Sequence, residues 1–253
     1  MIWFERGGSG GRTVLLLHGL GATSAVWKAV AQALQARGSI GWLAADLGGH
    51  GGSDWQSFYS VGQLAGQVAA VARQQQPGEL LIVGHSLGAY VGLALASGWF
   101  GITVRGVLGI GPKISWPAPD LQAAQELAAR PVRWYPTVEE ASSRYRRVSG
   151  ISSDIAPGEE WLARGLVQAE QGWRLAQDPR TFAVAGAPFA SLAASATATI
   201  LLARGERDPM VSLQELRAHA LQVHDIKGAG HNVHIEDPAA VVALLEQLVA
   251  RSE

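Results

Sequence analysis

The sequence predicts an α/β fold in which helices cover both faces of a mostly parallel central sheet, with a mainly helical insertion in the second half. Three observations support this prediction. Over residues 1–110, apolar strand-like runs alternate with helical patterns. Between residues 112 and 198 this alternation stops, and from residue 199 it resumes. We therefore expect a core formed by residues 1–111 and 199–253, and a helical cap formed by residues 112–198.

The first part of the core consists of strand-like and helix-like segments in turn. Most of the strand segments are nearly continuous apolar runs, which is typical of parallel strands buried on both faces. The expected strands are residues 2–6, 13–17, 40–45, 80–83 and 104–110, and the expected helices are residues 26–37, 61–75 and 89–98. The glycine-rich run at 7–11 is expected to be a tight connection between two paired strands, because no helix follows it as in a phosphate-binding loop.

The insertion differs in character from the segments around it. Prolines recur there, no run resembles a buried parallel strand, and tryptophans occur at positions 116, 134, 161 and 173. After it, the sheet pattern continues with expected strands at 199–203 and 222–226 and expected helices at 213–220 and 238–251. Because the insertion lies between two strands of the core, we expect it to form a cap on the core and not a separate tethered domain.

Composition excludes several classes of function. No apolar run approaches the roughly 18 residues of a membrane-spanning helix, and the first residues lack the layout of a signal peptide. The chain has no cysteine, which excludes disulfides and thiolate nucleophiles. Its net charge of −1 argues against broad binding to nucleic acid or to anionic membranes. We expect a cytoplasmic protein whose partner is a small-molecule substrate, and the sequence leaves its oligomeric state open.

The most informative motif is G-H-S-L-G at residues 84–88, which places Ser86 between an apolar strand and a helix-forming stretch. A serine on such a sharp turn is exposed, and glycines two residues to either side remove side chains that would collide. The turn also places Ser86 at a helix N-terminus, where free N–H groups favour negative charge on a substrate oxygen. The alternatives are a helix N-cap and a phosphate-binding loop.

A serine nucleophile needs a base and a group that orients the base. Asp208 follows the expected strand that ends at residue 203, and His231 follows the one that ends near residue 226. The C-terminal ends of parallel strands lie along one edge of a sheet, where catalytic groups converge. The order Ser, Asp, His, each after a separate strand, is typical of a catalytic triad on this kind of sheet. Glu206 is the alternative acid.

Four other histidines are alternatives to the base proposed above. His85 lies inside the serine motif, so its side chain is expected to point away from the serine hydroxyl. His18, His50 and His234 are expected to brace their turns or to pack beneath the loop that follows the last strand. None of these histidines is spaced with carboxylates as metal ligands are, so we expect no metal and no cofactor.

These motifs resemble those of the α/β-hydrolase family, and the resemblance extends over essentially the whole chain. Besides residues 84–88, three segments match: H-G-L-G at 18–21, D-L-G-G-H-G-G-S at 46–53 and G-H-N-V-H-I-E-D-P at 230–238. The resemblance implies that Ser86 is the nucleophile, His231 the base and later the acid, and Asp208 the orienting carboxylate. It also implies an oxyanion hole formed by the backbone N–H groups of Leu20 and Leu87.

The substrate is expected to be selected by the cap. Trp116, Trp134 and Trp161 of the cap are candidate substrate-binding residues, and Trp27 is a further candidate for the pocket wall, with core packing as its alternative. The basic run at 144–147 is expected to be a solvated helix face, because acids of the cap balance its arginines. The expected function is hydrolysis of a small to medium apolar ester-like substrate through an acyl-enzyme. The alternatives are hydrolysis of a carbon–carbon bond or a thioester, and a non-catalytic receptor.

Overall fold

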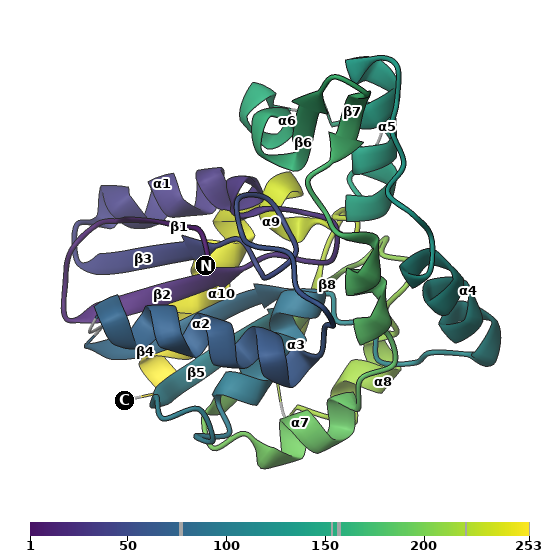
Figure 1. Cartoon of the computed structure of the whole chain (residues 1–253). Coiled ribbons are helices and arrows are strands. Elements are labelled where there is room, and N and C mark those ends of the chain that lie inside the picture. Colours follow the sequence, from purple (N-terminus) through teal and green to yellow (C-terminus); the bar gives the residue numbers. More distant parts are fainter. Residues whose placement is uncertain (76–77, 153, 156–157, 221, 253) are drawn as a thin grey trace.

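The computed structural model of the chain describes residues 1–75, 78–152, 154–155, 158–220 and 222–252. Within these residues the central sheet has seven strands in the order β1-β3-β2-β4-β5-β8-β9 (Figure 1). Neighbouring strands are parallel except for β1, which is antiparallel to β3. The strands are β1 (Phe4–Gly7), β2 (Arg12–Leu17), β3 (Ile40–Ala45), β4 (Glu79–His85), β5 (Val104–Ile110), β8 (Thr199–Gly205) and β9 (Val223–Ile226). The predicted fold class is confirmed.

Helices cover both faces of the sheet because its strands carry apolar side chains on both sides. Two helices, α2 (Val61–Gln75) and α3 (Leu87–Leu95), pack on one face, and α1 (Lys28–Arg37) and α10 (Pro238–Arg251) pack on the other (Figure 1). In β4, Ile82 belongs to the first core and its neighbour Val83 to the second, and both are fully buried. The sheet therefore separates two apolar cores.

Several elements differ from the predicted bounds. The predicted helix at 26–37 begins with a 3-10 turn, η1 (Ser24–Trp27), and the predicted helix at 89–98 is α3, which starts two residues earlier. The helix α8 (Leu213–Arg217) is shorter than predicted, and the single turn α9 (Val233–Glu236) has no counterpart in the prediction. Elements of one turn are too short to show a helical period in the sequence.

The expected pairing of the first two strands is wrong. Strand β1 pairs with β3, with Gly7 opposite Trp42, and β2 lies on the other side of β3. The glycine-rich run therefore crosses the start of β3 and closes no hairpin. Gly10 has a φ of +152°, and a Cβ on it would collide with the carbonyl oxygen of Ser39, so only glycine lets the chain pass this close to its neighbour.

Residues 112–198 contribute no described strand to the central sheet. Their helical elements are α4 (Ala118–Ala128), α5 (Val138–Ser149), α6 (Glu159–Gly165), η2 (Pro179–Val184) and α7 (Phe189–Ser195). They also include a two-stranded hairpin, β6 (Leu166–Ala169) and β7 (Gly172–Leu175), which the sequence pattern did not predict. Figure 1 shows α5, α6 and this hairpin as a lobe at the top of the molecule, whereas α7 packs beside α3. Among the described helices, none is long and apolar enough to span a bilayer.

A buried ion pair joins this lobe to the core. Arg164 on α6 donates a hydrogen bond of 2.7 Å to Oδ2 of Asp46, which follows β3 and is fully buried. The same carboxylate accepts hydrogen bonds from the N–H groups of Ser24 at 2.7 Å and Gly52 at 2.8 Å. The Arg164 guanidinium also lies over the ring of Trp3, 3.0 Å from its centroid. These contacts fix the base of the lobe beside the sheet edge.

Candidate active site

Ser86 occupies a strained turn between β4 and α3. Its φ is +49° and its ψ is −112°, and among the described residues it alone combines a side chain with a positive φ. Its N–H donates a 2.8 Å hydrogen bond to the carbonyl oxygen of Ile110, which ties the turn to β5. A Cβ on Gly84 would collide with the carbonyl of Gly88, and a Cβ on Gly88 with that of Leu17. These glycines permit the close strand-to-helix approach that presents the serine hydroxyl.

Asp208 and His231 form a buried pair in the loops after β8 and β9. Nδ1 of His231 lies 2.7 Å from Oδ2 of Asp208, and the two side chains are 9% and 0% exposed, respectively. Because a carboxylate only accepts hydrogen bonds, Nδ1 carries the proton and Nε2 keeps its lone pair. Oδ1 of Asp208 accepts a 2.9 Å hydrogen bond from the N–H of Met210, which orients the carboxylate. The imidazole can therefore accept a proton at Nε2.

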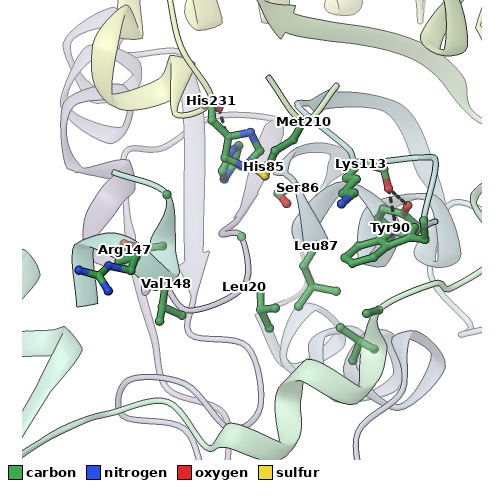
Figure 2. A pocket seen from close by; sticks show the side chains of 16 residues that line it. Leu20, His85, Ser86, Leu87, Tyr90, Lys113, Arg147, Val148, Met210 and His231 are labelled. Atoms are coloured by element: carbon green, nitrogen blue, oxygen red, sulfur yellow. Dashed lines mark hydrogen bonds between the residues drawn. The ribbon is translucent and has the colours of Figure 1, made fainter. Parts of the chain in front are cut away.

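A cavity of about 180 Å³ brings Ser86 and His231 together (Figure 2). Most of the side chains in its wall are apolar or aromatic: Leu20, Leu87, Tyr90, Trp116, Val148, Val184, Ala185 and Met210. Within the described residues, the hydrogen bonds of His231 go to Asp208 and His85 and not to the serine hydroxyl. Catalytic hydrogen bonds of this kind often tighten only when a substrate binds. The cavity thus places a serine and an oriented base around an apolar space.

Two backbone N–H groups beside Ser86 are candidates to bind a negatively charged oxygen. Leu20 follows β2, and Leu87 is the first residue of α3, so its N–H has no acceptor within the helix. Neither group donates a hydrogen bond to another part of the described chain. Figure 2 shows both leucines next to Ser86. The two donors are available for an oxyanion that forms at the serine.

A row of four contacting aromatic rings begins at His231 and continues into the core. The ring centroids are 4.6 Å apart for His231 and His85, and 4.5 Å apart for His85 and His234. The ring of Trp27 follows, 4.4 Å from that of His234. Nε2 of His85 donates a 3.0 Å hydrogen bond to the backbone carbonyl of His231. Burial lowers the pKa of His85 well below its ordinary value and that of His234 to about 3, so both rings pack as neutral groups.

The two remaining buried histidines hold the loops after β2 and β3. Nε2 of His18 accepts a 2.9 Å hydrogen bond from the N–H of Leu47, and Nε2 of His50 accepts one of 3.2 Å from the N–H of Gly21. Burial lowers the pKa of His50 to about 3. Over the part of the chain that the structure describes, no group of three or more metal-binding side chains is arranged to hold a metal ion.

The structure places the four candidate tryptophans in different surroundings. Trp116 lines the active-site cavity. Trp27 is fully buried at the end of the row of rings, and Trp134 lies 5.8 Å from the guanidinium of Arg174 within the lobe. Trp161 lines a separate depression between α1 and α6. These three do not line the cavity, because a large ring packs against whichever apolar surface the fold offers it.

Several cavity residues are absent from the sequence-based candidates. Tyr90 lies one helical turn after Ser86 on α3, and Met210 follows closely on the predicted acid, so proximity to the motifs is a signal for both. Val148 at the end of α5 and Val184 at the end of η2 also line the cavity. They come from two parts of the insertion, the lobe and η2, whose positions over the site have no local signal in the sequence.

The chain is similar in sequence and in fold to several known proteins. The model of the family described as "Alpha/beta hydrolase family" matches residues 14–244. The chain is 27% identical to Lipase LipV of Mycobacterium tuberculosis, over 67% of this chain and 64% of that protein, which is just under two thirds of the lipase. It is 30% identical to the 2-succinyl-6-hydroxy-2,4-cyclohexadiene-1-carboxylate synthase of Klebsiella pneumoniae, over 97% of each chain. The solved structure of E-2-(acetamidomethylene)succinate hydrolase shares the fold, with a TM-score of 0.78 and 23% identity over 98% of this chain and 94% of that one.

Proposed function

This chain belongs to the alpha/beta hydrolase family, and from that premise we propose that it is a serine hydrolase that cleaves a small to medium apolar ester-like substrate through an acyl-enzyme. The observation that carries the proposal is the convergence of the strained Ser86 and the buried His231–Asp208 pair on one apolar cavity. Backbone strain persists only where the surrounding structure maintains it, and it is concentrated at functional sites. A protein that only binds a ligand has no need of this arrangement.

In the first half of the proposed reaction, the hydroxyl oxygen of Ser86 attacks the acyl carbon while its proton passes to Nε2 of His231. The N–H groups of Leu20 and Leu87 donate hydrogen bonds to the oxyanion that forms on the carbonyl oxygen. Asp208 stabilises the imidazolium through Nδ1 and does not take up the proton itself. The bond to the leaving alcohol then breaks, the alcohol takes the proton from the imidazolium, and the acyl group remains on the serine.

In the second half, water takes the place of the alcohol. His231 removes a proton from the water, whose oxygen attacks the acyl carbon. Cleavage of the bond to Ser86 returns the proton to the serine oxygen and releases the carboxylic acid. The net reaction consumes one water and yields one alcohol and one acid.

The cavity sets the size and polarity of the acyl group. Its volume of about 180 Å³ is below the roughly 300–1,000 Å³ that is usual for drug-sized ligands, which favours a short or medium chain. Its apolar wall favours an uncharged group next to the scissile bond. Replacement of Val184, which lines the cavity from η2, by tryptophan is expected to shift the preference to shorter chains.

Hydrolysis of p-nitrophenyl esters from acetate to laurate tests the proposal. We expect sustained turnover by the wild type with an optimum at short or medium chains, and turnover near background for Ser86→Ala. Ser97→Ala is the matched control, because Ser97 is a buried serine that does not line the cavity. Equal turnover by the wild type and Ser86→Ala would overturn the proposal, and at most one product per protein molecule would support a receptor. S-acyl thioesters of the same chain lengths, assayed in parallel, separate an esterase from a thioesterase.

A further inference from the structure

A second cavity, here called the arginine cleft, adjoins the active-site cavity. It has a volume of about 110 Å³ and lies between α5 and the segment that follows α4. Arg130, Arg133 and Arg144 line it, and no acidic side chain is among the described residues of its wall. The cleft therefore gathers three positive charges around one small concave space.

These three arginines have no carboxylate partner within the described parts of the chain. The ion pairs of the insertion include those of Lys113, Arg164 and Arg180, each with an aspartate. Two of these aspartates, Asp120 and Asp178, belong to the insertion, whose acidic and basic residues balance as a whole. Like charges that surround one cavity repel one another, and an anion bound between them replaces that repulsion by attraction.

The arginine side chains can bind an oxyanion because of their hydrogen-bond donors and their positions in the wall of the cleft. The guanidinium of Arg133 lies 5.0 Å from the centroid of the Tyr135 ring, and that tyrosine is only 6% exposed, so the ring holds the charge at the cleft. A planar guanidinium can donate two parallel hydrogen bonds to a carboxylate or a phosphate. Arg144 lines the cleft from α5, whereas Arg133 lines it from the segment that precedes this helix. An anion in the cleft can therefore be bound by arginines of two different segments.

Val148 lines both cavities, so the cleft and the cavity at Ser86 lie on either side of this side chain. Arg144 lies four residues before it on the same face of α5, about 6 Å away along the helix. Two cations line the active-site cavity itself, but Lys113 is paired with an aspartate, and the guanidinium of Arg147 points away from Ser86 (Figure 2). Negative charge on a substrate is thus better accommodated beyond Val148 than beside the serine.

We propose that the arginine cleft binds an anionic group of the substrate, a carboxylate or a phosphate, while the apolar part with the scissile carbonyl occupies the cavity at Ser86. This inference rests on the proposed function and narrows its substrate class. The substrate is an ester or thioester whose anionic group is separated from the carbonyl by a linker that passes Val148. Hydrolysis itself follows the steps given above, and the cleft contributes to binding alone.

Two series of matched substrates test the proposal. The first compares p-nitrophenyl monoesters of dicarboxylic acids, from succinate to suberate, with neutral p-nitrophenyl esters of the same chain length. The second compares butyryl-coenzyme A, which carries phosphates on its leaving group, with the neutral thioester butyryl-N-acetylcysteamine. We expect kcat/KM to be about tenfold or more higher for the anionic member of one series, as for a hydrogen bond to a charged group. The series that shows the preference identifies the anion as carboxylate or phosphate.

Variants of the cleft decide whether the arginines cause that preference. Arg133→Gln and Arg144→Gln are each expected to remove most of it by raising KM for the anionic substrate, with the neutral substrate unaffected. Arg105→Gln is the control, because Arg105 lies at the start of β5, away from the C-terminal strand ends that carry the site. Equal kcat/KM for both members of both series, or a preference that survives both glutamine variants, would overturn the proposal.

Failure of the proposed function gives a different result, in which the neutral substrates are not turned over either. Thermal unfolding then tests the cleft independently of catalysis, with glutarate and inorganic pyrophosphate as probes. A rise in Tm for the wild type that is lost in Arg133→Gln supports the anion site. No rise with either probe, or an equal rise in the variant, contradicts it.

Discussion

The backbone of Ser86 stores strain that glycine would release. Its φ of +49° and ψ of −112° are unfavourable for any residue with a Cβ, at a cost of about 1–3 kcal/mol. Ser86→Ala keeps the Cβ and therefore the strain, whereas Ser86→Gly removes both. Glycine loses more conformational entropy on folding, about 0.5–1 kcal/mol relative to alanine. When the middle of the entropy range is subtracted from the middle of the strain range, Ser86→Gly is expected to be about 1 kcal/mol more stable than Ser86→Ala.

Thermal unfolding of the two variants measures this difference. For a chain of 253 residues, an unfolding entropy of about 2.1 cal/mol/K per residue converts it to a Tm about 2 °C higher for Ser86→Gly. Ser97, just after α3, is the matched control because it is buried and its φ is negative. There the glycine variant should melt below the alanine variant. If Ser86→Gly melts at or below Ser86→Ala, the strain argument is refuted.

Three further predictions concern the acid, the buried histidines and the anchor of the lobe. Asp208→Asn should lower kcat by roughly 10³–10⁴-fold with an unchanged circular dichroism spectrum, because an amide no longer selects the Nδ1–H tautomer; a loss below about tenfold contradicts the orienting role. The folded pKa of His50 and His234 is about 3, so as pH falls below about 6.5 the unfolded chain takes up protons that the folded chain does not. The contribution of each histidine to the free energy of unfolding is therefore fully present above that pH and falls by about 2 kcal/mol between about pH 7 and pH 5. Urea unfolding should show a smaller fall for His234→Phe than for the wild type. An equal fall in the two proteins excludes this histidine as the linked group. Arg164→Met should lower the free energy of unfolding by about 3 kcal/mol, because Asp46 stays buried without its cation, and should speed hydrogen exchange in α6; unchanged exchange there contradicts the anchor.

The core could be predicted from the sequence because its signals are local. An apolar run bounded by glycines or polar residues identifies a buried strand wherever the strand lies in the sheet, and β2 to β5 lie at or near their predicted positions. The partner of a strand is not a local property. Residues 2–6 alternate as any edge strand does, and this pattern is the same whether the strand pairs with β2 or with β3. The pairing with β3 follows from the arrangement of the whole sheet.

Local signals in the sequence also predict the serine, the acid and the base of the candidate site. They do not predict which side chains line the cavity. Ser86 follows β4 directly, Asp208 and His231 lie in the loops after β8 and β9, and parallel strands bring such positions to one edge. Val148 on the lobe and Val184 on η2 reach the cavity only because tertiary contacts fix these parts of the insertion in place. Trp27, Trp134 and Trp161 carry no signal that distinguishes core packing from substrate contact. The basic run at 144–147 was expected to be a solvated helix face, and Arg147 is exposed there, whereas the position of Arg144 in the wall of the arginine cleft has no signal in the sequence.

Labelling with a fluorophosphonate, followed by mass spectrometry of the digested protein, tests most directly whether Ser86 is a nucleophile activated by the His231–Asp208 pair. The reagent reacts with an activated serine and needs no knowledge of the substrate. We expect one label per chain, on the peptide that contains Ser86, and no label on Ser86→Ala or on His231→Ala. A folded wild type that stays unlabelled, or a label on another residue, would contradict the account.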